Sequence, residues 1–119
     1  MSLRSPYIFS AAMDVDPDKE QLFQEVYDTE HVPLLLKVPG VIAVARFEAE
    51  KEMTLLIGGQ RKRIVLRESE PRFQALYAIE RPEVLTSEAW AAAVDEGRWP
   101  EQVRPFTRNR QHKLLRLVG

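Results

Sequence analysis

The pattern of apolar and polar positions predicts β-strands in four stretches of the chain. The stretches cover residues 7–13, 41–48, 72–80 and 109–117. A period of two sends successive side chains to opposite faces of a sheet, so each stretch has a defined inner and outer row.

Helical spacing appears between these strands, in residues 17–31 and 82–96. In the first stretch Leu22, Phe23 and Val26 recur three and four positions apart, which predicts an amphipathic helix. The sequence also marks the ends of both helices: Asp16 and Pro17 fit an N-cap and a first helical position, and Gly97 fits a C-terminal stop.

The end of the first helix is unusual because Pro33 follows His31 closely. A proline has no N–H and clashes with the carbonyl four residues earlier, here that of Thr29. We therefore expect the helix to end or kink near His31, and Pro39-Gly40 to close the short apolar turn that follows. Main-chain geometry would then fix the position of His31.

The order β-α-β-β-α-β predicts an α+β fold, a ferredoxin-like sandwich with an antiparallel sheet. We expect residues 4–119 to form a single domain. Residues 49–71 interrupt the pattern, and two short apolar runs there flank Gly58-Gly59, which predicts a protruding hairpin. The basic run Arg61-Lys62-Arg63 is interpreted as its solvated tip.

The predicted sheet is apolar on both faces. In residues 72–80 Phe73 and Tyr77 face one way, while Leu76 and Ala78 face the other. In residues 41–48, strict alternation would place Val41, Ala43, Ala45 and Phe47 together on one face. Two helices cover only one face of such a sheet. We expect a second copy of the chain to cover the other face, giving a homodimer.

Composition narrows the function. Lys and Arg number 17 and Asp and Glu 18 among 119 residues, whereas nucleic-acid binders are usually basic. The third strand also lacks the glycines of an RNA-recognition strand, so we expect no nucleic-acid partner. The absence of cysteine excludes thiolate chemistry and disulfides. No apolar run is long enough to span a membrane, so we expect no membrane partner and a cytoplasmic location.

One motif resembles a known family. The segment Tyr27-Asp28-x-Glu30-His31-x-Pro33-Leu34-Leu35, followed by Val38-Pro39-Gly40-Val41, is similar to the helix-to-strand region of EthD-like proteins in the dimeric α+β barrel superfamily. The second half of the chain, with its aromatic third strand and with Trp90 in the following helix, is similar too.

The resemblance implies a ferredoxin-like protomer that forms a dimeric α+β barrel, with a cavity between sheet and helices. Relatives include cofactor-free monooxygenases, haem-degrading oxygenases, isomerases and lyases of small organic molecules. The histidine of the motif falls on His31. No complete catalytic set is transferred by the resemblance, because a fold does not settle a function.

The candidate site is built around His31 as a general acid or base whose pKa lies near neutral pH. Tyr27 lies one turn earlier on the same helical face. The expected pocket residues are Phe23, Leu34, Phe9, Tyr77 and Trp90. In the alternative interpretation, His31 caps the interrupted helix. We expect Trp99 to be a core or interface anchor and His112 to be exposed or interfacial.

The ligand types do not show a metal-binding spacing, so we expect no metal and no cofactor, although His31 could serve a haem. The leading hypothesis is a small homodimer that binds a small apolar or aromatic molecule, as a cofactor-independent oxygenase or isomerase. The alternative is a non-catalytic binding or structural dimer.

Overall fold

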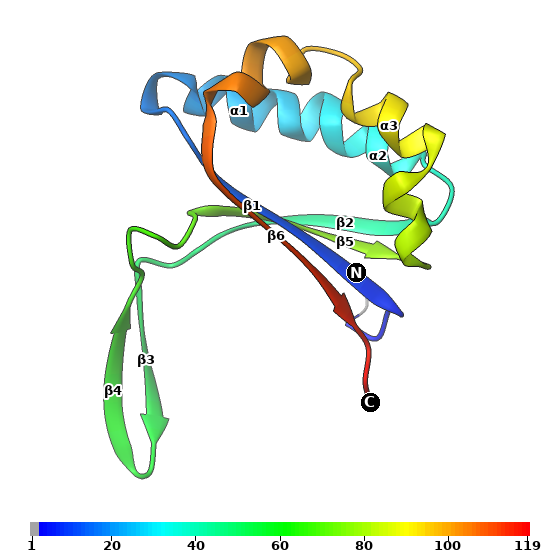
Figure 1. Ribbon diagram of the computed structural model, residues 1–119. Helices are drawn as coiled ribbons and strands as arrows, with labels where there is room; N and C mark the ends of the chain where they lie inside the picture. The colour runs from blue at the N-terminus through cyan, green and yellow to red at the C-terminus, as the bar shows by residue number, and fades with distance from the viewer. Residues whose placement is uncertain (1–2) are drawn as a thin grey trace.

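The computed structural model describes residues 3–119, and a four-stranded antiparallel sheet is its central element (Figure 1). The strands of this sheet are β1 (Tyr7–Val15), β2 (Val41–Glu48), β5 (Phe73–Ile79) and β6 (Thr107–Arg116), in the order β2-β5-β1-β6. This is the predicted ferredoxin-like α+β arrangement, in which the first and third strands lie side by side in the centre.

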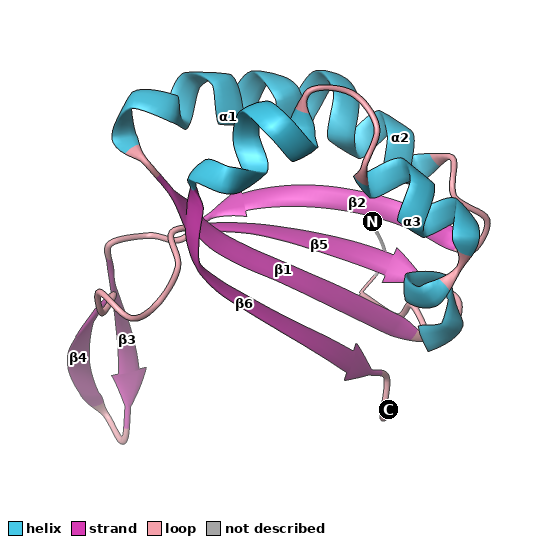
Figure 2. Ribbon diagram, turned by 45° about the horizontal axis from the view of Figure 1, so that its top comes forward, coloured by secondary structure: helices cyan, strands magenta, loops and turns pink. Residues whose placement is uncertain are grey.

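The helices form one layer on one face of the sheet, and the other face is left open (Figure 2). The first helical rod contains η1 (Pro17–Lys19), α1 (Glu20–Val26), the π-helical turn η2 (Tyr27–His31) and α2 (Val32–Leu36). The second helical region contains η3 (Pro82–Thr86), α3 (Glu88–Val94), the π-helical turn η4 (Trp99–Val103) and η5 (Arg104–Phe106). None of the helices within residues 3–119 is long and apolar enough to cross a membrane.

The first helix was predicted to end or kink near His31. Instead, the helix widens at this point and continues through Pro33. The N–H of Val32 bonds to the carbonyl of Tyr27, five residues earlier, and α2 continues in the same direction (Figure 1). Because Pro33 cannot donate a hydrogen bond, the chain inserts one extra residue into a turn instead of breaking the helix. Such π-bulges are frequent at functional sites.

The second predicted helix is two separate pieces. Ser87 is extended, with φ −73° and ψ 154°, and its hydroxyl accepts a hydrogen bond from the N–H of Trp90. This is an ordinary N-cap arrangement, so α3 begins after Ser87, and Pro82–Thr86 forms a separate 3-10 turn.

Strand β2 departs from the predicted alternation because of a bulge between Val41 and Ala43. The extra residue turns Val41 to the helix side, while Ala43, Ala45 and Phe47 share the open side with their partners in β5. Val44 and Arg46 therefore face the helices.

The segment between β2 and β5 carries a hairpin that projects from the open side of the sheet (Figure 1). It consists of β3 (Glu52–Ile57) and β4 (Gln60–Val65), joined by Gly58 and Gly59 with φ of 59° and 79°. Positive φ at both positions is what a two-residue type I′ turn requires.

The hydrophobic core lies between the sheet and the helices. Phe23, Val26 and Leu35 of the first rod are fully buried, as is Ile79 of β5. Gly40, with φ 94°, brings the turn after α2 so close to Val84 that an added Cβ would lie 2.4 Å from a methyl carbon of Val84. The chain reversal after α2 therefore depends on glycine at this position.

Candidate functional site

A cavity of about 210 Å³ lies between the centre of the sheet and the helix layer. Its walls come from β1, β5, β6 and both helical regions. The lining residues are Phe9, Ala11, Met13, Tyr27, His31, Leu35, Tyr77, Trp90, Val94, Trp99, Arg104, Arg110 and His112. Most of these side chains are aromatic or aliphatic, which is typical of a small-molecule site.

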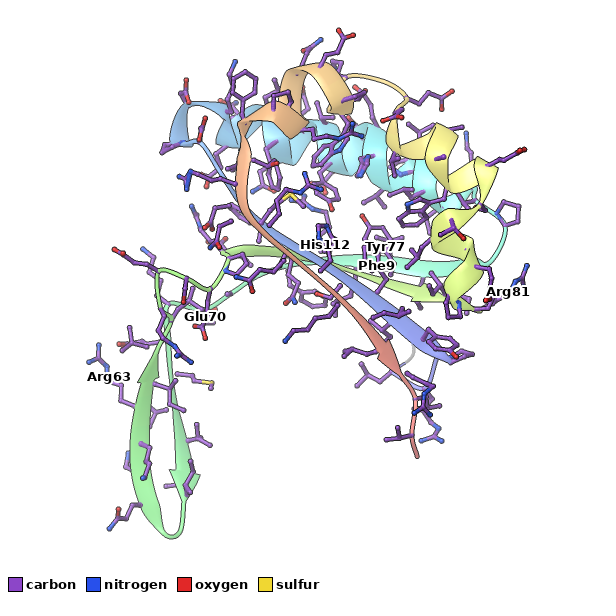
Figure 3. All side chains as sticks on the ribbon, in the orientation of Figure 1. Phe9, Arg63, Glu70, Tyr77, Arg81 and His112 are labelled. Atoms are coloured by element: carbon purple, nitrogen blue, oxygen red, sulfur yellow. The ribbon has the colours of Figure 1, made fainter. Side chains whose placement is uncertain are left out.

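The sheet contributes a layer of rings to the cavity. Phe9, Tyr77 and His112 rise from three neighbouring strands toward the helices (Figure 3). The ring of Phe9 stacks on His112, with centroids 5.8 Å apart and planes 7° apart, and lies 5.5 Å from the ring of Tyr77. These contacts follow from the register, which places Phe9 opposite Tyr77 and Ala11 opposite His112.

The two π-helical turns supply the other aromatic side chains. Tyr27 and His31 stand at the two ends of η2, and Trp99 begins η4. The rings of His31 and Trp99 are stacked at 4.3 Å, and Tyr27 meets both of them edge-on. The widened turn caused by Pro33 thus brings two polar aromatic residues to the same cavity.

An ion pair ties the two π-helical turns together. Glu30 accepts hydrogen bonds from the backbone N–H of Arg98 at 2.9 Å and from its Nε at 2.5 Å. Gly97, with φ 73°, leaves room for this carboxylate, since an added Cβ would lie 2.5 Å from its Oε1. These bonds to Arg98 lower the pKa of Glu30 and fix Trp99 over His31.

Tyr27 and Tyr77 form a buried hydroxyl pair at the sheet side of the cavity. Their oxygens are 3.1 Å apart, and either can donate. Burial raises the pKa of Tyr27, an effect that the bond to Tyr77 partly offsets, and burial raises the pKa of Tyr77 well above its usual value. Both groups are therefore neutral near pH 7 and can offer one hydroxyl hydrogen to a ligand.

His31 is 5% exposed, and its Nδ1 is a buried atom without a hydrogen-bond partner among the described residues. Burial lowers its pKa to about 4, assisted by the positive charges of Arg104, Arg110 and Arg46. The expectation of a pKa near neutrality is therefore wrong. Desolvation and three guanidinium groups outweigh any stabilisation of the imidazolium, and neutral His31 is a proton acceptor, not an acid.

Two of the three guanidinium groups that lower the pKa of His31, those of Arg46 and Arg104, are already held by other residues. Arg46 donates to Asp28 and Gln24 at 2.6 Å each and lies over the ring of Tyr27. Arg104 donates to the carbonyl of Val94 and to Asp95. No Asp or Glu lines the cavity.

The structure distributes the predicted site residues over three places. His31, Tyr27, Phe9, Tyr77 and Trp90 come together around the cavity. Phe23 does not line it: this residue is fully buried beneath Tyr27 and packs on Phe73, because α1 turns it toward the end of β5. Leu34 does not line the cavity either: it packs partly buried against the edge of the core and borders a shallow groove with Thr29 and Lys37.

Sequence reasoning missed eight lining residues, and four of these carry an aromatic ring or a charge: Trp99, Arg104, Arg110 and His112. Trp99 lies in the core and His112 is exposed, as expected, but both also border the cavity, and the two arginines belong to no sequence motif. Pro100 and Pro105 are the sequence signal that was available, because prolines at the starts of η4 and η5 mark an irregular helical segment next to a tryptophan.

A larger, open depression of about 650 Å³ lies at the base of the hairpin. Charged residues such as Glu48, Arg67 and Arg72 dominate its walls, and it contains neither a histidine nor an aromatic ring. Within residues 3–119, no three His, Asp or Glu side chains come together in a way that could hold a metal ion.

Comparison with known proteins finds relatives of this fold among solved structures. No family model matches the chain, and no curated protein matches it in sequence. Among solved structures, an EthD (ethyl tert-butyl ether D) family protein from Bacillus halodurans is similar with a TM-score of 0.56 and 14% identity, over 94% of this chain and 99% of that one.

Two structures of the heme-degrader MhuD are similar to the same degree. The structure from Mycobacterium tuberculosis with two hemes bound has a TM-score of 0.55 and 15% identity, over 96% and 97% of the two chains. A mutant of MhuD with two manganese protoporphyrin IX molecules per active site has a TM-score of 0.57 and 14% identity, over 96% of each chain. The fold implied by the EthD-like motif is therefore confirmed.

The cavity around His31 does not fit a porphyrin. At about 210 Å³ it is smaller than the roughly 300–1,000 Å³ of pockets that hold drug-sized ligands. Haem binding by this cavity would require a different arrangement of Trp90 and Trp99.

Proposed function

We propose that the chain binds a small, single-ring aromatic or similarly sized apolar molecule in the cavity around His31. The observation that carries this proposal is a small cavity with mainly aromatic and aliphatic lining residues, which His31 borders. An apolar cavity of about 150 Å³ is enough to hold benzene. The volume found here leaves room for one ring with a small substituent.

The chemistry proposed for this site is proton abstraction from a bound organic molecule. Neutral His31 accepts the proton, and the hydroxyl pair of Tyr27 and Tyr77 donates a hydrogen bond to the oxygen on which negative charge develops. Loss of a proton from carbon is the shared first step of an isomerisation and of an oxygenation without cofactor. The EthD family neighbour and MhuD support only the fold on which this site is built.

We also propose that the protein is a homodimer formed through the open face of the sheet. This face combines small residues, namely Ser10, Ala12, Ala43, Ala45 and Ala78, with larger apolar side chains such as Ile8, Phe47, Leu76 and Leu115. The small residues let a second sheet approach closely, and the larger ones supply apolar area for it to cover. A net charge of −1 offers little repulsion between two identical copies.

The hairpin supports the same proposal. Met53, Ile57 and Ile64 lie on one of its faces and are about half exposed. An isolated two-stranded hairpin is marginally stable in water, and this one projects on the side where a second copy would lie (Figure 1). Contact with the partner would cover its apolar face.

A ligand screen tests the binding proposal. Single-ring aromatic fragments such as benzyl alcohol should raise the melting temperature, by an amount that grows with ligand concentration. The variant Ala11→Leu fills the floor of the cavity and should abolish the effect, whereas the control Ala91→Leu, at an exposed position of α3, should retain it. Equal responses of both variants would place the ligand elsewhere.

Non-catalytic binding is the second candidate, favoured by the low pKa of His31 and by its stacking under Trp99. Exchange of the methyl hydrogens of bound acetophenone, a single-ring ketone whose enolate carries its charge on oxygen, with D2O separates the two candidates. The enzyme proposal expects exchange that is accelerated by the wild type and lost in His31→Gln. Binding without accelerated exchange assigns the protein to the non-catalytic class.

A further inference from the structure

The charged side chains that line the cavity are all basic, a feature that the binding proposal does not use. The cavity walls contain Arg104, Arg110 and His112 but no carboxylate, although the chain as a whole has one more acidic than basic residue. Positive side chains around a small cavity, without compensating acids, are the expected environment of an anionic ligand group.

Arg110 is the group most available to such a ligand. Its Nη1 donates to the hydroxyl of Thr107 at 3.1 Å, and no ion pair joins it to any described carboxylate. Arg104, in contrast, already holds Asp95 at 2.8 Å and the carbonyl of Val94 at 2.6 Å. A guanidinium that forms one neutral hydrogen bond retains most of its donors.

A bulge in β6 aims Arg110 at the cavity. The register places Gln111 opposite Ala12 and Arg108 opposite Asp14, so that Asn109 and Arg110 together face the single residue Met13. Asn109 has φ 53°, a left-handed conformation that few non-glycine residues adopt, and its amide is held by Asp14 at 3.0 Å. Bulges near active sites commonly redirect a side chain in this way.

The geometry points to a specific ligand class: we propose that Arg110, with Arg104 in the wall of the same cavity, binds the carboxylate of a single-ring aromatic acid whose ring packs against Phe9, Tyr77 and Trp90. This proposal rests on the proposed function of the cavity and adds the charge of the ligand. The fork of a guanidinium matches the two oxygens of a carboxylate.

The same contact would change the basicity of His31. The charged and titratable groups around this histidine are Arg104, Arg110, Arg46, His112, Tyr27 and Tyr77. The guanidinium charges are part of the reason for its lowered pKa. A bound carboxylate offsets them, so His31 becomes a stronger base when the ligand is present.

Calorimetric titration with benzoate and with benzyl alcohol tests the proposal, since the two probes share the ring and differ in charge. We expect the wild type to bind benzoate more tightly than the alcohol. Arg110→Gln should weaken benzoate binding by roughly tenfold or more, the effect of losing a charge-assisted hydrogen bond, and leave the alcohol unchanged. Arg108→Gln removes a charge from the same strand outside the cavity and should change neither affinity.

Histidine NMR provides an independent measurement. The chain has two histidines, and benzoate, but not benzyl alcohol, should raise the pKa of His31. Equal affinity of the wild type for the two probes, or equal weakening of both in Arg110→Gln, would overturn the anion subsite while leaving the cavity proposal intact. Failure of both probes to bind would overturn the cavity proposal together with the subsite.

Discussion

The two faces of the central sheet use the same strands for different purposes. On the helix side, the row through Tyr77 and Phe9 carries large rings that contact the ring of Trp90 in α3. On the open side, the neighbouring row through Ala78 and Ile8 carries small or aliphatic side chains. Rigid rings from several directions leave a cavity between them, while small residues form a flat surface that a second sheet can approach.

Backbone irregularity is concentrated around the cavity, with one further bulge in β2 between Val41 and Ala43. The two π-helical turns and the bulge at Asn109 all border the helix-side cavity. The regular pairing of β1 with β5 underlies the open face without a register shift. Irregular backbone near the cavity is what fixes His31, Trp99 and Arg110 in place, and such features concentrate where function requires particular side-chain positions.

The largest expected effect comes from placing a charge on the open face. Leu76→Arg should weaken association by roughly 5 kcal/mol, or several thousandfold, because the dimer would have to bury an unpaired guanidinium. Light scattering after gel filtration should then find a monomer with an unchanged circular dichroism spectrum. The control Leu36→Arg, at an exposed position of α2, should remain dimeric, and a wild-type monomer would refute the proposed interface.

Removal of a ring on the covered side should damage the fold itself. Phe23 is fully buried among three other rings, so Phe23→Ala should lower the free energy of unfolding by about 3–5 kcal/mol. Phe47, on the open side, is 51% exposed in the single chain. Phe47→Ala should mainly weaken association. If denaturant titrations gave the two variants the same effect, the distinction between the faces would be lost.

The burial of His31 should make the free energy of unfolding decrease at acid pH. The pKa of His31 is about 4 in the folded chain against 6.5 when unfolded, so the unfolded chain takes up the proton first as the pH falls. Stability should be unaffected by this group above about pH 6.5 and should decrease between pH 6.5 and 4, by about 3 kcal/mol in total. His31→Gln should show a correspondingly smaller loss over this range, and parallel curves for both proteins would contradict the burial of His31.

The tyrosine pair should give the smallest effect. Tyr27→Phe or Tyr77→Phe leaves one buried hydroxyl without its 3.1 Å partner and should lower the free energy of unfolding by about 1–2 kcal/mol. The double variant removes both polar groups and should lose less than the sum of the single changes. A purely additive double-mutant cycle would argue against a direct hydrogen bond.

The sequence predicted the parts of the fold that depend on local pattern. Alternation and helical spacing sufficed for the four strands, the first helix and their order. The bulge near Val41 was not predictable, because it depends on pairing with β5 and not on the residues of β2 alone. Pro33 signalled an irregularity correctly, but whether a helix breaks or widens there is decided by the packing of α2 on the core.

The candidate site could also be predicted only where it depends on local pattern. Tyr27 and His31 share a helix and could be grouped by spacing. Trp99, Arg104 and Arg110 reach the cavity from segments far along the chain, through the second π-helical turn and the bulge at Asn109. The low pKa of His31 depends on those distant charges and on burial, neither of which can be obtained from its neighbours in the sequence.

The central claim is that the cavity around His31 binds a small organic molecule, and the tryptophan indole N–H signals test it most directly. The chain contains two tryptophans, Trp90 and Trp99, and both line the cavity. Titration of the ¹⁵N-labelled protein with benzyl alcohol should shift both signals in a saturable way in the wild type and in Ala91→Leu, but not in Ala11→Leu. Saturable shifts confined to other parts of the chain, or no shifts at all, would contradict this account of the cavity.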